Sequence, residues 1–264
     1  MRILVTGHRG LIGSKIVDRL RLFHEVDGID KKYNIKHNTN NLYTDDEKYD
    51  LIIHCADNCI IREVIKDSTL APENIAGTLQ VLNLAKRTGC KKVIMFSSSR
   101  VESNNHNPYI TSKKYMEEET KAYHECYGID YIIIRPETVW GLNDNYVRVI
   151  PTWIINALQN KPLIVYGDKD KELAPIYVDD FVDLIMGYIT HFDIYKNDTY
   201  NIKGSPLKVR EIIKTIKRIT NSKSKVIYKK AELSQPQLCN NKYDKCTEYD
   251  NFEERLEEVI KWQK

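Results

Sequence analysis

The chain has 264 residues, of which 42% are hydrophobic and 29% are charged, a composition typical of a globular protein with a sizeable core. Its formal net charge of +3 is the difference between 40 basic and 37 acidic residues. These charges are interleaved along the sequence, which argues against a nucleic-acid partner. The chain contains no apolar stretch long enough to cross a bilayer and no cleavable signal pattern at its N-terminus. We therefore expect a cytoplasmic protein without a membrane partner.

The six cysteines lack the paired spacing of a zinc site, and no histidine cluster accompanies them. We expect them to be reduced thiols, and we expect no bound metal.

Short apolar runs alternate with helical patterns along the first half of the chain. We predict strands at residues 2–6, 25–30, 50–55, 92–96 and 131–134, and helices at residues 14–23, 75–88 and 109–126. Strands separated by helices predict a parallel sheet that is covered on both faces. With right-handed crossovers this is an α/β fold of the doubly wound, Rossmann type.

The alternation becomes irregular after Pro136. We predict helices at residues 149–160, 178–189, 207–220 and 252–263, and a short strand at residues 163–166. This pattern predicts a small mixed C-terminal lobe. We therefore expect an NAD(P)-binding Rossmann domain over residues 1–140, completed by parts of residues 174–202, and a mainly substrate-binding lobe over residues 141–264.

A glycine-rich segment joins the first predicted strand to the first predicted helix. Gly7 permits a tight turn, Gly10 lets backbone amides approach a diphosphate, and Gly13 lets the helix pack closely on the strand. The partial positive charge at the helix N-terminus then attracts the anion. The segment therefore predicts a dinucleotide pyrophosphate site. The other residues that we expect in this site are Arg9, Leu11 and Ile12.

Asp30 ends the second predicted strand, where an acidic residue is expected to bind the adenine ribose. Its carboxylate would accept hydrogen bonds from the ribose and repel a 2′-phosphate, which favours NAD. Arg9 and Lys31 favour NADP instead, since both can pair with that phosphate. We expect NAD, with NADP as the alternative.

Tyr109 and Lys113 lie four residues apart at the start of a predicted helix, so they project from one face. A free tyrosine has a pKa near ~10, but a lysine ammonium one turn away and a positive nicotinamide stabilise the phenolate. Tyr109 can then move a proton while hydride moves to or from the cofactor. The serines at residues 97–99 follow a predicted strand, and one of them can hold the substrate oxygen at the carboxyl end of the sheet.

Several motifs, taken in order, resemble those of the extended short-chain dehydrogenases of the NAD-dependent epimerase/dehydratase family. They are TGHRGLIG at 6–13, DLIIHCA at 50–56, NIAGT at 74–78, FSSSRV at 96–101, NPYITSK at 107–113, RPETVWG at 135–141, IVYG at 164–167 and YVDD at 177–180. The resemblance covers essentially the whole chain and implies a partner substrate that is a nucleoside-diphosphate sugar. It also implies a homodimer that packs through the helices at 75–88 and 109–126.

By position, the resemblance assigns the catalytic serine to Ser98, the acid/base to Tyr109 and its partner to Lys113. Ser99 is the alternative to Ser98, because a run of three serines leaves the register open by one. The residues that the resemblance places beside the cofactor are Cys55, Ala56, Asn74 and Pro136. The residues that we expect beside the substrate are Ser99, Thr138, Lys169 and Lys171.

Two departures from the family's motifs narrow the activity. The Asp-Glu pair of the dehydratases falls at Ser99 and Arg100, which disfavours a dehydratase. The family's diphosphate-binding arginine falls at Leu173. We predict a nucleotide-sugar epimerase or 4-ketoreductase. Two alternatives stay open: a reductase of a carbonyl without a nucleotide, and a protein that binds NAD(P) without turnover.

Overall fold

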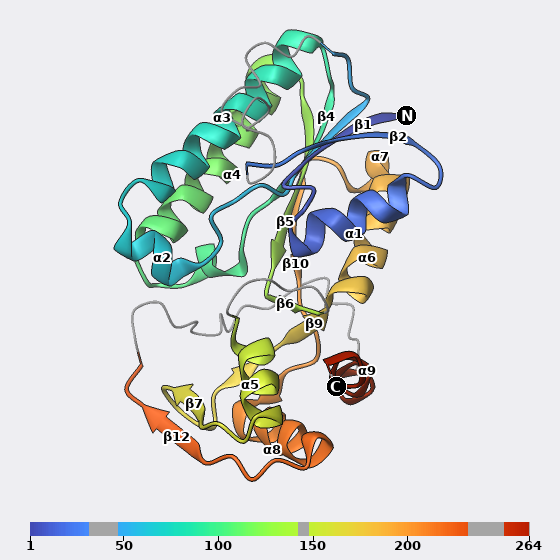
Figure 1. Cartoon of the computed structure of the whole chain (residues 1–264). Coiled ribbons are helices and arrows are strands. Elements are labelled where there is room, and N and C mark those ends of the chain that lie inside the picture. The colour runs from blue at the N-terminus through green and yellow to red at the C-terminus, as the bar shows by residue number, and fades with distance from the viewer. Residues whose placement is uncertain (32–46, 142–147, 232–250, 264) are drawn as a thin grey trace. The chain divides into compact units, whose positions relative to one another are not determined.

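The computed structural model describes residues 1–31, 47–141, 148–231 and 251–263 (Figure 1). The chain divides into two compact units. The first contains Met1–Pro136 and Val182–Asn201, and the second contains Glu137–Phe181 and Ile202–Lys264. The chain therefore leaves the first unit after Pro136 and returns to it from Val182 to Asn201.

A six-stranded sheet with the order β10-β5-β4-β3-β1-β2 forms the centre of the first unit. Its strands are β1 (Arg2–Thr6), β2 (Glu25–Ile29), β3 (Leu51–His54), β4 (Lys92–Phe96), β5 (Asp130–Pro136) and β10 (Asp198–Ile202). The five strands from β5 to β2 pair in parallel. The chain builds outward from β1 to β2 on one side and from β3 to β5 on the other. The strand order therefore reverses between β1 and β3, where doubly wound folds bind their ligands. This topology confirms the predicted Rossmann-type fold.

Helices cover both faces of this sheet (Figure 1). They are α1 (Leu11–Leu20), α2 (Ile61–Lys66), α3 (Leu70–Thr88), α4 (Pro108–Tyr127), α6 (Val178–Thr190) and α7 (Phe192–Tyr195), with a 3₁₀ turn, η2, at Ser99–Glu102. Figure 1 shows α3 and α4 on one side of the sheet and α1 and α6 on the other. Strand residues such as Ile52 and Ile133 pack with Leu82 of α3 and Met116 of α4 in one buried cluster. Each such side chain contributes roughly 1.5–3 kcal/mol by leaving water.

Local sequence signals fix both ends of α4. The side chain of Asn107 accepts a hydrogen bond from a first-turn amide, and Pro108 occupies the first helical position. Gly128 ends the helix with a φ of +64°, a conformation that glycine adopts without strain. These caps place Tyr109 and Lys113 in the first two turns of the helix.

The second unit is a mixed lobe of short strand pairs and three helices among its described residues. The pairs are β6 (Thr138–Trp140) with β9 (Pro175–Tyr177), β7 (Leu163–Tyr166) with β12 (Val226–Lys229), and β8 (Glu172–Leu173) with β11 (Leu207–Lys208). The helices are α5 (Val149–Leu158), α8 (Val209–Thr220) and α9 (Phe252–Gln263). Trp140, Trp153, Ile212 and Leu256 are buried in its core.

The first predicted helix is wrong by three residues at each end. It spans Leu11–Leu20 in place of residues 14–23, because the helix begins directly after Gly10 and includes Gly13. Residues 21–24 close it with turn hydrogen bonds to Val17 and Leu20.

Several other elements differ from the prediction, and the structure also contains elements that were not predicted: α2, α7, β6, β8, β9, β11 and β12. The helix predicted at 207–220 begins at Val209, because Leu207 and Lys208 pair with β8 and the Glu211 carboxylate accepts a hydrogen bond from the Lys208 amide at 3.3 Å. Strand β10 was not predicted, since only Tyr200 and Ile202 of its five residues are buried apolar side chains. The remaining predicted elements differ from the structure mainly at their ends.

Within the described ranges, no helix combines the length and apolarity that a membrane span requires. The same residues contain no group of three or more His, Cys, Asp or Glu side chains that could hold a metal ion.

Candidate active site

The turn between β1 and α1 requires glycine at two of its positions. Gly7 has a φ of +68°, and a Cβ atom there would lie 2.7 Å from the Ala56 nitrogen. A Cβ on Gly13 would lie 2.2 Å from the Gly7 carbonyl oxygen. Gly10 caps α1 without a side-chain hydrogen bond, so the first-turn amides, at Leu11 and Ile12, keep their donors available for an anion. The turn fits a dinucleotide diphosphate on these grounds.

Hydrogen bonds join the ends of β1 and β3 beside this turn. The Thr6 hydroxyl lies 2.8 Å from His54 Nδ1 and accepts a hydrogen bond from the Ala56 amide at 3.2 Å. The Cys55 amide donates to the Thr6 carbonyl at 3.1 Å. Burial, together with the nearby Lys113 charge, lowers the pKa of His54 to about 3, so this imidazole is neutral at physiological pH. Cys55 and Ala56 therefore lie where the strand order reverses.

The structure brings Asp30 to the glycine turn. Its carboxylate accepts a hydrogen bond from the Arg9 amide at 3.1 Å. The neighbouring Lys31 ammonium forms an ion pair with Glu73 of α3. Part of the positive charge that would attract a 2′-phosphate is thus already paired within the protein.

Asn74 joins α3 to the segment that follows β3. Its side-chain oxygen accepts hydrogen bonds from the Asn58 amide at 2.8 Å and from the Asn58 side chain at 3.0 Å. Glu73 also accepts from the Asn58 side chain, at 3.2 Å. The predicted cofactor-side asparagine therefore holds the loop that runs past the ends of β1 and β3.

Ser98, Tyr109 and Lys113 lie together and are nearly inaccessible, with exposed fractions of 7%, 6% and 5%. The Tyr109 hydroxyl is hydrogen-bonded to Ser98. The Lys113 Nζ atom donates to the Phe96 carbonyl at 2.7 Å and lies 5.9 Å from the centre of the Tyr109 ring. The fold thus joins the end of β4 to the start of α4 through the three predicted catalytic side chains.

The three consecutive serines have different surroundings. Ser97 donates to the buried Glu117 carboxylate, Ser98 accepts from the Arg100 amide at 3.3 Å and bonds Tyr109, and Ser99 begins η2. This arrangement favours Ser98 over Ser99 as the serine next to Tyr109.

The carboxylate of Asp57, which was not predicted from the sequence, also lies in this site. Asp57 Oδ2 is 3.2 Å from Lys113 Nζ, and the two side chains are only 10% and 7% exposed. Burial raises the pKa of Asp57, and the Lys113 charge opposes that increase. The signal was present in the sequence, because Asp57 lies two positions beyond the strand predicted at residues 50–55, and burying a carboxylate is unfavourable unless it is paired or has a function.

Burial raises the pKa of Tyr109 well above its usual value of 10, and the charges of Asp57 and Cys59 add to this increase. The hydrogen bond from Ser98 and the Arg100 charge act in the opposite direction. Tyr109 is therefore a phenol at neutral pH and can donate a proton.

A second group of residues that was not predicted from the sequence forms ion pairs next to the serine segment. The guanidinium of Arg135 on β5 donates to both oxygens of Glu117, at 2.8 and 2.6 Å, and to Glu102 at 2.5 Å. Asn201 on β10 also donates to Glu102, at 3.3 Å. This network connects four elements to the segment that carries Ser98.

Three of the predicted substrate residues, Thr138, Lys169 and Lys171, belong to the second unit. Thr138 begins β6 and is half-buried, while Lys169 is exposed. The Lys171 ammonium donates to the Tyr166 carbonyl at 2.9 Å. Leu173, where the resemblance expects an arginine, is 2% exposed and belongs to the apolar core of this unit. Pro136 ends β5 in the first unit.

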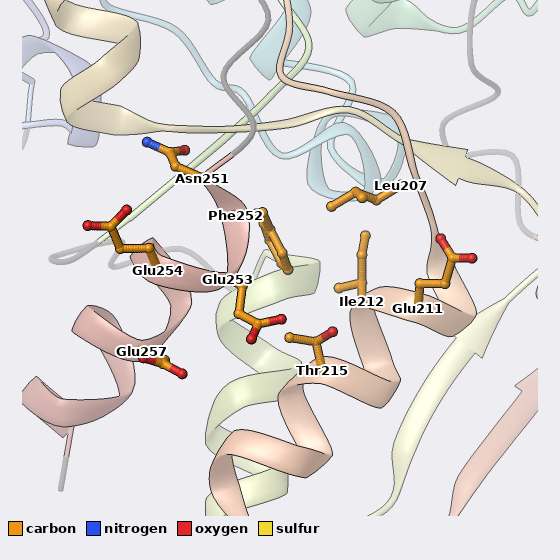
Figure 2. A pocket seen from close by; sticks show the side chains of 9 residues that line it. All are labelled: Leu207, Glu211, Ile212, Thr215, Asn251, Phe252, Glu253, Glu254 and Glu257. Carbon is orange, nitrogen blue, oxygen red and sulfur yellow. The ribbon is translucent and has the colours of Figure 1, made fainter.

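The second unit also contains a cavity of about 500 Å³ (Figure 2). It is lined by Leu207, Glu211, Ile212, Thr215, Asn251, Phe252, Glu253, Glu254 and Glu257. None of the predicted site residues is among them.

A Rossmann-type sheet, a glycine turn with available helix amides and an adjacent Ser-Tyr-Lys arrangement define the class of extended short-chain dehydrogenases. Residues 3–202 match the model of the NAD dependent epimerase/dehydratase family, and the chain belongs to this family. The family consists of enzymes, and NAD is its cofactor.

The chain is similar along most of its length to enzymes that act on UDP-sugars. It is 29% identical over 264 residues to a putative UDP-glucose 4-epimerase of Methanocaldococcus jannaschii, covering 86% of this chain and 85% of that protein. It is 26% identical to a UDP-glucuronate 4-epimerase of Thermodesulfobacterium geofontis, covering 81% and 72%.

Solved structures share the fold. The UDP-N-acetylglucosamine 4-epimerase of Methanobrevibacter ruminantium, in complex with UDP-N-acetylmuramic acid, has a TM-score of 0.82 and 25% identity, covering 99% of this chain and 97% of that one. The UDP-glucuronic acid 4-epimerase of Bacillus cereus, in complex with UDP-glucuronic acid and NAD, has a TM-score of 0.86 and 22% identity, with each chain covered completely.

Proposed function

We propose that this chain is an NAD-dependent epimerase or 4-ketoreductase of nucleotide sugars. The observation that carries the proposal is the buried contact of Ser98 with Tyr109, one helical turn from Lys113 and beside the glycine turn. A solvated helix face, the simplest alternative for a tyrosine and a lysine four residues apart, does not bury both side chains.

The residues that would hold NAD come from the ends of β1, β2 and β3. Amides of the Gly7–Gly13 turn would bind the diphosphate, and Asp30 would accept hydrogen bonds from the adenine ribose. The ion pair of Lys31 with Glu73 supports NAD over NADP, because it lowers the positive charge available to a 2′-phosphate. NAD, when bound, supplies a carbon that accepts hydride from the sugar and can return it.

Tyr109 would exchange a proton with the oxygen of the reacting sugar carbon. As a phenol it donates a proton when a carbonyl is reduced, and as a phenolate it accepts one when a hydroxyl is oxidised. The Ser98 hydroxyl would hold the same oxygen. Hydride taken from the sugar and given back to the opposite face of the resulting ketone would yield the epimer, whereas NADH taken up from solution would supply the hydride for net reduction of a keto sugar.

The substrate assignment rests on the relatives, which act on UDP-sugars. We propose that residues 141–264 contribute most of the substrate lobe, with Thr138 beside the substrate and Lys169 and Lys171 near its diphosphate. A reductase of a non-nucleotide carbonyl is the second candidate, and the burial of Leu173 in the apolar core favours it, because the expected cation is missing there.

The test is to incubate the purified protein with NAD or NADH and a panel of UDP-, GDP- and dTDP-sugars, and to identify products by mass spectrometry and NMR. We expect a C4 epimer or a reduced sugar from a UDP-sugar. Tyr109→Phe should lower turnover at least about 100-fold, whereas Tyr115→Phe, the same change on the same helix, should leave it unchanged. Absence of NADH binding would contradict the whole proposal, and turnover of a plain carbonyl alone would support the second candidate.

A homodimer through α3 and α4 is part of the same proposal, as is a cytoplasmic location. The two helices pack side by side, and the Tyr123 hydroxyl on α4 donates to Asn83 on α3 at 2.9 Å. Sedimentation equilibrium of the protein decides between a monomer and a dimer.

A further inference from the structure

A buried ion pair lies one helical turn from the tyrosine of the site. The Asp57 carboxylate follows β3, and the Lys113 ammonium, 3.2 Å away, projects from α4. Lys113 has a second partner, the Phe96 carbonyl at the end of β4. The lysine is therefore held by one backbone carbonyl at the end of β4 and by one carboxylate beyond the end of β3.

This pairing changes what Lys113 can do for Tyr109. A lone ammonium close to a phenol favours the phenolate, but a carboxylate at 3.2 Å cancels most of its field at any greater distance. Tyr109 lies farther from the ammonium than Asp57 does, with its ring centre at 5.9 Å. The Asp57 charge also acts on Tyr109 directly and disfavours its ionisation.

Other groups face the same pair from neighbouring elements. His54 and Cys55 lie close to Lys113, and Cys59 and Arg100 lie close to Tyr109. His54 is neutral, and burial raises the pKa of the Cys55 thiol, so neither adds a charge near neutral pH. Arg100 opposes Asp57.

We propose that Asp57 is a positioning residue that neutralises Lys113 and keeps Tyr109 protonated, so that Tyr109 begins its work as a proton donor. The proposal rests on the proposed function only for the role of Tyr109. It predicts an enzyme whose resting site is prepared to protonate an oxygen, as in the reduction of a carbonyl.

A purely structural role for Asp57 makes a different prediction. If the carboxylate only satisfies a buried ammonium, its removal lowers stability and leaves the titration of Tyr109 where it is. Asp57→Asn separates the two roles, because the amide oxygen can still accept from Lys113 while the negative charge is gone.

The experiment is ¹³C NMR of protein labelled at the tyrosine ring carbon that bears the hydroxyl, titrated from about pH 6 to about pH 12 so that the raised pKa of Tyr109 falls within the range. The chain has 17 tyrosines, so the Tyr109 signal is assigned by its loss in Tyr109→Phe. We expect Asp57→Asn to lower the pKa of Tyr109 by about one unit or more, and Asp57→Glu to keep it near the wild-type value. The control is Glu118→Gln, which removes a lysine-paired carboxylate that is 75% exposed on the same helix, and it should cause no shift.

An unchanged pKa in Asp57→Asn, or an equal shift in Glu118→Gln, overturns the proposal. If Asp57→Asn does not fold, Asp57→Asn with Lys113→Gln takes its place and is compared with Lys113→Gln alone. The pKa of Tyr109 must then be lower in the double variant. The titration needs neither cofactor nor substrate, so it stands even if no sugar is turned over.

Discussion

At the scale of single residues, the three serines after β4 show how identical neighbours acquire different roles. Ser97 is bonded to Glu117, Ser98 to Tyr109, and Ser99 begins a 3₁₀ turn. The backbone of a strand end turns successive side chains to different sides. The sequence left open which of the three serines lies next to Tyr109. The answer thus depends on the side chains that surround residues 97–99.

This division predicts different effects for two alanine variants. Ser98→Ala removes a hydroxyl that we expect to hold the reacting oxygen, so turnover should fall about 100-fold or more. Ser99→Ala should change kcat only a few-fold. The measurement is steady-state kinetics with the sugar identified in the product screen, and a larger loss in Ser99→Ala would move the catalytic assignment to Ser99.

At the scale of elements, the β1–α1 turn and the end of β3 constrain each other. Gly7 lies against Ala56, and Gly13 lies against the Gly7 carbonyl, so both approaches exclude a side chain. Their closeness keeps the α1 amides beside the place where the strand order reverses. The turn therefore depends on its own glycines and on a strand 40 or more residues farther along the chain.

Two glycine-to-alanine changes inside helices test this constraint. Gly13→Ala places a Cβ 2.2 Å from a backbone oxygen, so the turn must shift, and we expect NADH affinity to fall at least about tenfold. Gly187→Ala on α6 meets nothing within 4 Å and should leave binding unchanged, while stabilising the fold by up to about 1 kcal/mol. Fluorescence titration gives the affinities, and equal affinities in the two variants would contradict the steric argument.

A second set of contacts between elements, the ion pairs of Arg135, supports the serine segment at residues 97–99. The Arg135 guanidinium on β5 joins Glu117 of α4 to Glu102 of η2. Both ion pairs are largely buried, and removing one partner of such a pair leaves a buried charge that commonly costs about 3–5 kcal/mol. The network therefore ties the position of Ser98 to the packing of α4 on the sheet.

At the scale of the whole molecule, the choice of cofactor should be visible as stability. A ligand that binds only the folded state stabilises it by about 2.7 kcal/mol at 100 times its Kd. We expect NAD to raise the unfolding temperature more than NADP at equal concentration, because Asp30 accepts from the glycine turn and Lys31 is paired with Glu73. Thermal scans with each nucleotide measure this difference. A larger shift with NADP would reverse the preference, and Asp30→Asn should reduce the shift with NAD.

Much of the fold was predictable because its signals are local. The strands at Lys92–Phe96 and Leu163–Tyr166 were predicted to the residue, since short apolar runs between polar residues leave few alternatives. The helix with Tyr109 and Lys113 was predicted to within one residue at each end, since the structure has it at Pro108–Tyr127. Strand β10 was not predictable, because its position depends on pairing with the edge of β5 and not on its own composition.

By itself the sequence indicated the Rossmann class, the glycine turn and the candidate serines, tyrosine and lysine, because each belongs to a local motif or to a repeated strand–helix order. Only the tertiary structure decided which serine meets Tyr109 and which carboxylate meets Lys113. Asp57 and Lys113 are 56 positions apart and come together because β3 and β4 are neighbours in the sheet and α4 packs against their ends. Such a pairing depends on strand order and burial, which no local pattern encodes.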